Sequence, residues 1–120
     1  MTRESPTQKR VLLAVGSRPD VRISRNNCGL AEYPDGFKVK YGLFNPGGAD
    51  LIGLQRILIT PQMVGKHIGR FVAIECKSDR GQTSEAQDNF LAMVLHMGGL
   101  AVVARSVADA VEALDGGLFD

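Results

Sequence analysis

The sequence predicts an α/β fold in which a small, mixed central β-sheet is flanked by helices. Two observations favour this class: segments of helical periodicity begin at serine caps, and short apolar runs rich in β-branched residues lie between them. A third is the composition, since 120 residues with 44% hydrophobic and 22% charged side chains suit one globular domain. We therefore expect a single domain over residues 1–120.

The first expected helix begins at Ser5, with Pro6 as its first helical residue and Gln8 completing a capping box, and ends at Gly16. Residues 21–26 alternate apolar and polar side chains, which is typical of a half-buried strand. Residues 27–49 are rich in glycine and contain two prolines, so we expect a loop with one short strand at most.

A second core strand is expected over residues 50–54, and a third over residues 70–77. The segment between them either continues the second strand or forms a hairpin arm that turns near residues 61–69. The remaining elements are a helix from Ser84 with Gln87 in a second capping box, a strand over residues 100–104, and a last helix capped by Ser106.

Cysteine and histidine usage argues against two common classes of site, a disulfide framework and a zinc site. Cys28 and Cys76 lie far apart in unlike contexts, which argues against a disulfide framework, and no Cys/His spacing is typical of zinc. No apolar run reaches the length of a membrane span, and the first residues are polar. We therefore expect a cytoplasmic protein.

Charge is unevenly distributed along the chain. Residues 1–40 hold eight Lys/Arg against four Asp/Glu, whereas residues 41–120 hold six against nine. A basic half beside an acidic half favours a phosphate-binding surface next to a metal site.

The strongest functional signal is the run Phe71–Lys77, which is apolar and ends in Glu-x-Lys. Alternation places Glu75 and Lys77 on one face of a strand, and Asp50 begins the preceding core strand. An acid at one strand and an acid and lysine at the next are typical of a metal-dependent phosphodiesterase. Mg²⁺ prefers such oxygen ligands, and the backbone carbonyl of Cys76 is a candidate third ligand. Lys77 would hold the attacking water or stabilise charge on the phosphate.

Each of these residues also has a structural interpretation. Glu75 and Lys77 are equally suited to an ion pair on a half-exposed strand, and Asp50 to a turn after two glycines.

The chain resembles the virus-type replication-repair nuclease family, a branch of the PD-(D/E)XK nuclease superfamily, over about residues 4–114. The matching segments, in order, are Glu4-x-x-x-Gln8, Arg25-Asn26-Asn27 followed by Gly29, Gly48-Ala49-Asp50-Leu51-Ile52-Gly53, Phe71 to Ser78, Gly81 with Gln87, and Gly98 to Val103.

This resemblance implies a restriction-endonuclease-like α-β-β-β-α-β core and a nuclease dependent on Mg²⁺ or Mn²⁺. It implies Asp50 and Glu75 as metal ligands and Lys77 as the catalytic lysine. The family's helix residues map to Glu4, as a further ligand, and to Gln87, as a further catalytic residue. Both also have a structural interpretation at the start of a helix.

Arg25, Asn26 and Asn27 match the family at a predicted strand end, where phosphate contacts are common, so they are candidates for DNA binding. Ordinary solvated surface is the alternative for all three.

Small members of the family with no attached domain resemble phage four-way-junction resolvases. That implies a DNA substrate with a branch, a homodimer with two active sites, and a bacterial or phage-infected cell. The alternatives are a nicking or flap nuclease of phage replication or repair, and a non-catalytic DNA-binding module with a nuclease-like fold.

Overall fold

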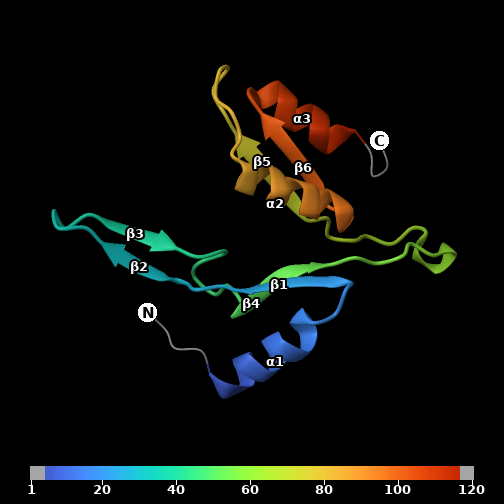
Figure 1. Ribbon diagram of the computed structural model, residues 1–120, viewed down its shortest axis with the longest axis horizontal. Coiled ribbons are helices and arrows are strands. Elements are labelled where there is room, and N and C mark those ends of the chain that lie inside the picture. The colour runs from blue at the N-terminus through green and yellow to red at the C-terminus, as the bar shows by residue number, and fades with distance from the viewer. Residues whose placement is uncertain (1–4, 117–120) are drawn as a thin grey trace. The chain divides into compact units, whose positions relative to one another are not determined.

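The computed structural model describes residues 5–116, and they form a mixed α/β structure with three helices and short strands (Figure 1). The predicted α/β class is confirmed. Within these residues the strands pair as three two-stranded sheets, namely β1–β4, β2–β3 and β5–β6. The chain divides into two compact units, Met1–Gln55 and Arg56–Asp120.

Helix α1 (Pro6–Gly16) opens the first unit and begins as expected, because the Ser5 hydroxyl accepts a hydrogen bond from the Gln8 amide at 3.1 Å. The predicted capping box is only half formed, since the Gln8 side-chain oxygen has no hydrogen-bond partner in the described structure. A cap needs the Ser5 bond alone, so the helix tolerates this.

Helix α1 packs on β1 (Val21–Arg25), which pairs antiparallel with β4 (Leu51–Gln55). The two strands approach closely where Ile23 faces Gly53, because a Cβ at Gly53 would overlap the backbone carbonyl of Arg22. Asp50 lies one residue before β4, so the predicted strand is shifted by one position.

An antiparallel hairpin of β2 (Gly29–Glu32) and β3 (Lys38–Tyr41) occupies the segment expected to hold at most one short strand. In Figure 1 it extends away from β1 and β4 of the same unit. The expectation failed at β2, whose sequence lacks the β-branched residues that mark strands. The strand forms because β3 supplies its hydrogen-bond partners.

The second unit is built on β5 (Val72–Cys76) and β6 (Leu100–Ala104), which pair in parallel. Helix α2 (Glu85–His96) connects them, and α3 (Val107–Asp115) follows β6 (Figure 1). Both helices pack on this sheet. Val94 of α2 is fully buried, so the parallel pair and its crossover helix form the core of the unit.

The expected hairpin arm between the second and third strands is wrong. Residues 56–71 form no strand, and their one regular element is a short 3₁₀ helix, η1 (Pro61–Met63). Pro61 removes a backbone donor, and Gly65 and Gly69 weaken any strand beyond it. The apolar side chains of Ile57, Leu58 and Ile59 are exposed.

None of the helices in residues 5–116 has the length and apolar character needed to span a membrane.

Candidate functional site

Three predicted site residues meet in the second unit, and we call them the Glu75 cluster: Glu75, Lys77 and Gln87. The Gln87 amide nitrogen donates to Glu75 Oε1 at 2.6 Å, and Lys77 Nζ lies 3.4 Å from the same oxygen. The Glu75 and Lys77 side chains are 30% and 20% exposed, so both are reachable but largely enclosed. Alternation along β5 thus predicted their shared face correctly.

Gln87 performs both tasks that the sequence left open. Its Oε1 accepts the backbone N–H of Ser84 at 2.9 Å, which completes a capping box, while its Nε2 reaches Glu75. The cap fixes which end of the amide faces the sheet, and the remaining donor orients the carboxylate. Gln87 is therefore both a helix cap and a positioning residue for Glu75.

The geometry leaves oxygen donors for a cation. The Gln87 and Lys77 contacts of the Glu75 carboxylate both fall on Oε1, which leaves Oε2 for another partner. The predicted third oxygen is also well directed. The Phe71 carbonyl and the Lys77 amide both bond to β6, and bonding direction alternates along a strand. The Cys76 carbonyl therefore points to the other edge of β5, which no strand covers within residues 5–116.

Arg105 is a residue that sequence reasoning missed. Its guanidinium Nη1 donates to the carbonyls of Ser78 at 2.5 Å and Gly81 at 2.7 Å. These bonds fasten the loop that follows Lys77 to the end of β6. No local pattern indicates them, because Arg105 lies more than twenty residues away in sequence.

Asp50, the remaining predicted ligand, belongs to the first unit and lines a pocket with a volume of about 90 Å³. The other lining residues are Gln8, Arg25, Asn26, Asn27, Cys28 and Gly48. All three predicted DNA-contacting residues therefore lie beside Asp50. The Asp50 backbone carbonyl accepts a hydrogen bond from the backbone N–H of Asn26 at 2.8 Å, which extends the pairing of β1 with β4.

Within this pocket Asn26 has a clear structural role. Its side-chain nitrogen donates to the carbonyls of Leu43 and Ala49, both at 3.0 Å, and its oxygen accepts the Leu43 amide at 2.9 Å. The side chain thereby ties the end of β1 to the chain that leads into β4. Arg25 and Asn27 line the same pocket and stay candidates for contacts with DNA.

Gln8 is a second residue whose importance sequence reasoning missed. Its Oε1 is buried, has no hydrogen-bond partner among the described residues, and belongs to a side chain that lines the Asp50 pocket. A buried acceptor without a donor is costly, so such an oxygen is suited to a bound cation or water. The signal in the sequence was the Glu4-x-x-x-Gln8 match, but only its acid was given a role in metal binding, and Gln8 was assigned to a capping box.

Asp50 belongs to the first unit, and the Glu75 cluster belongs to the second. Glu4 lies outside the described residues. Within residues 5–116 no three His, Cys, Asp or Glu side chains gather as a metal-binding group.

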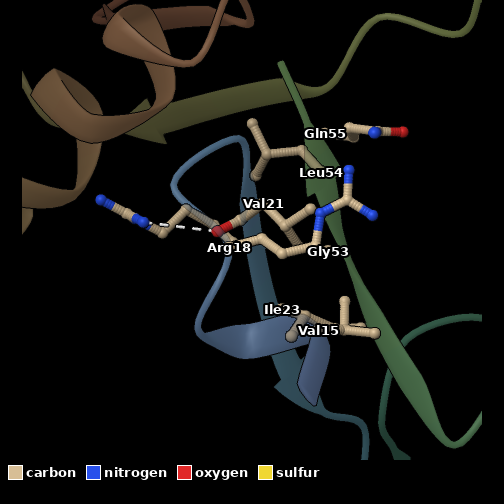
Figure 2. Close-up of a pocket in the computed structure, with 8 residues that line it drawn as sticks. Val15, Arg18, Val21, Ile23, Gly53, Leu54 and Gln55 are labelled. Atoms are coloured by element: carbon tan, nitrogen blue, oxygen red, sulfur yellow. Dashed lines mark hydrogen bonds between the residues drawn. The ribbon is translucent and has the colours of Figure 1, made fainter. Parts of the chain in front are cut away.

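A second pocket in the first unit, of about 280 Å³, lies between the end of α1 and the strands β1 and β4 (Figure 2). Figure 2 labels Val15, Ile23 and Leu54 among its apolar lining residues. Arg18 also lines the pocket, but its guanidinium lies 2.7 Å from the Asp20 carboxylate. The hydrogen bond from Arg18 lowers the pKa of the Asp20 carboxyl. The charge of Arg18 is therefore already balanced, and we assign this pocket no ligand.

Comparison of the chain with models of protein families, with curated proteins and with solved structures found no match.

Proposed function

We propose that this protein is a metal-dependent endonuclease that hydrolyses phosphodiester bonds in branched DNA. The observation that carries the proposal is the Glu75 cluster, in which a strand carboxylate is held on one oxygen by Gln87 and Lys77. An ion pair alone would not need an oriented amide as well. The proposal includes the restriction-endonuclease-like core and places the activity in the cytoplasm.

The donor set fits a hard divalent cation. We assign Mg²⁺ or Mn²⁺ to the carboxylates of Asp50 and Glu75 and to the Cys76 carbonyl, with Gln8 Oε1 as a further acceptor in the Asp50 pocket. When bound, the cation supplies positive charge against the phosphate and favours ionisation of a water. Gln87 holds Glu75 in the orientation that presents its second oxygen.

Lys77 supplies the remaining charge. Its ammonium group lies beside Glu75, where it can hydrogen-bond the attacking water or a phosphate oxygen. The Arg105 bonds to the following loop limit the movement of the chain beyond Lys77. These residues thereby orient water and phosphate, which is most of what this reaction asks of a protein.

A panel of substrates tests the proposal. The pure protein is incubated with labelled duplex, flap, splayed-arm and four-way-junction DNAs in Mg²⁺, Mn²⁺ or EDTA. A junction resolvase is expected to act as a homodimer, cut the junction preferentially and stop in EDTA. Preference for flaps or nicks favours the repair nuclease instead. Binding without cleavage in either metal favours the non-catalytic DNA-binding module.

Gln87→Glu separates the two tasks of Gln87. Glutamate accepts the Ser84 amide, so the capping box and the melting temperature should be retained. It has no donor for Glu75, so the carboxylate loses its orientation, and cleavage is expected to fall about 10- to 100-fold even though the added negative charge favours a cation. Single-turnover cleavage and thermal melting provide the two measurements. A variant that melts and cleaves normally would reduce Gln87 to a helix cap.

Arg25→Ala tests the phosphate contact beside Asp50. Removing one phosphate contact should lower by about one the slope of the logarithm of the DNA-binding constant against the logarithm of the salt concentration. It should weaken binding to all the DNAs to a similar extent. The matched control is Arg80→Ala, an exposed arginine of the second unit. Fluorescence anisotropy at several salt concentrations gives the slope. An unchanged slope and affinity would return Arg25 to ordinary surface.

A further inference from the structure

The β2–β3 hairpin carries aromatic side chains that the described fold does not bury. Tyr33 and Phe37 are 53% and 63% exposed, and their ring centroids lie 6.1 Å apart. Tyr41 is also exposed, as is every residue of β3. Exposed rings on a projecting ribbon do not contribute to a core, so another contact is expected to use them.

The strand register gives the hairpin two different faces. Residues directly opposite one another in an antiparallel pair share a face. Ala31 faces Val39, and the Tyr33 amide bonds to the Phe37 carbonyl, so one face carries the rings and apolar groups. The other face pairs Leu30 with Lys40 and Glu32 with Lys38. One face is therefore aromatic and the other carries both lysines.

Hydrogen bonds hold the hairpin in this shape at both ends. At the base, the Asn45 side chain donates to the carbonyls of Gly29 at 2.9 Å and Tyr41 at 2.8 Å. At the tip, the Asp35 carboxylate accepts the Phe37 amide at 2.9 Å. The rings are thus presented on an ordered ribbon, which reduces the entropy lost when a ligand stacks on them.

We propose that this hairpin binds an unpaired segment of DNA at a branch point, with bases on the aromatic face and phosphates near the lysines. The inference rests on the proposed function for its substrate and names the feature that is recognised. Proteins bind single strands without reading sequence by combining aromatic rings, which stack bases, with cations that attract the backbone. Here the rings and the lysines lie on opposite faces of one ribbon, so the strand would pass around its edge.

The lysine charges of the hairpin favour DNA as its ligand over a second copy of the chain. Lys38 and Lys40 form no ion pair within residues 5–116, although Glu32 is the cross-strand neighbour of Lys38. The Asp35 carboxylate is bonded within the turn. Two unpaired lysines favour a phosphate backbone, whereas an apolar self-interface would leave this second face unused.

Binding is measured in Ca²⁺ or EDTA, so the result does not depend on cleavage. The probe is splayed-arm DNA with 2-aminopurine in an unpaired arm, which reports stacking through quenching and is undisturbed by tryptophan because the chain has none. The combined variant Tyr33→Ala/Phe37→Ala should weaken splayed-arm binding at least about tenfold and abolish the quenching, with duplex affinity changed less than about twofold. Lys38→Gln/Lys40→Gln should weaken both DNAs and lower the salt slope by about two.

Three further variants keep the test sharp. Tyr33→Phe preserves the ring and should bind normally, whereas Phe37→Leu preserves apolar contact but removes the flat surface and should reduce quenching. Leu13→Ala, on the exposed face of α1, is the control for loss of apolar area. Equal losses on duplex and splayed-arm DNA would overturn the proposal. So would normal DNA binding with a fall in mass by light scattering, which would assign the rings to a second copy. If the native protein cleaves no DNA in Mg²⁺ or Mn²⁺ but shows this binding pattern, the nuclease proposal is refuted and the hairpin proposal stands.

Discussion

Glu75→Gln and Asp50→Asn are each expected to lower the rate of DNA cleavage at least about 100-fold while the protein stays folded. Each change removes one negative charge with almost no change in shape, so a divalent cation loses a ligand on which its binding depends. Glu75→Gln also replaces an acceptor of the Gln87 and Lys77 contacts with an amide, which disturbs the orientation of the cluster.

Single-turnover cleavage at saturating protein measures the effect, and circular dichroism checks the fold. The matched control is Glu85→Gln, the same chemical change at an exposed position in the first turn of α2. It should cleave within about twofold of the native protein, because surface changes of this kind are small. Near-native cleavage by a folded Glu75→Gln or Asp50→Asn protein would remove that residue from the metal site.

The double variant tests whether the two carboxylates act together. The proposal assigns both Asp50 and Glu75 to metal binding in one reaction. Residues that act as one group are strongly non-additive, so the double variant should be little slower than the worse single variant. Multiplied losses would mean that the two carboxylates act independently.

The helices were predictable from sequence because their signals are local. The side chains of Ser5, Ser84 and Ser106 each accept a hydrogen bond from the amide three residues later. A cap and its partner lie within one turn, so no knowledge of the fold is needed to recognise them. Strands β5 and β6 were predictable for a related reason, since a short run of apolar residues is typical of a parallel pair.

The hairpin and the segment at residues 56–71 were not predictable in this way. β2 is held by β3 and by the Asn45 side chain, which are contacts between residues separated in sequence. At residues 57–59 a strand was expected and none forms. The β-branched residues there indicated a strand, but the described part of the unit offers it no partner. Strand propensity depends on what lies alongside, and a single sequence does not contain that information.

The candidate site divides along the same line. Glu75 and Lys77 follow from strand alternation, and the cap formed by Gln87 follows from helix geometry. That Gln87 also reaches Glu75 depends on how α2 packs on β5, and the roles of Arg105 and Asn26 depend on loops brought together by folding. Spacing predicted that Glu75 and Lys77 share a face, but only packing gives the contacts with Gln87 and the loops.

Lys77→Met is expected to lower the single-turnover rate at least about 100-fold while metal and DNA binding are retained. Methionine keeps much of the length of lysine and removes the charge that faces the water or phosphate. Glu75 keeps its hydrogen bond from Gln87, so its orientation toward a cation should survive.

Two measurements on the same protein separate the roles open to Lys77. DNA affinity in Ca²⁺ reports binding without chemistry, and cleavage of fully bound DNA in Mg²⁺ reports the chemical step. Lys66→Met is the matched control, because Lys66 is an exposed lysine in the segment between β4 and β5. If affinity collapses and bound DNA is still cut at the native rate, Lys77 is a phosphate anchor. If both stay native, Lys77 only balances the charge of Glu75 across their 3.4 Å contact, and the ion-pair interpretation of this strand is correct.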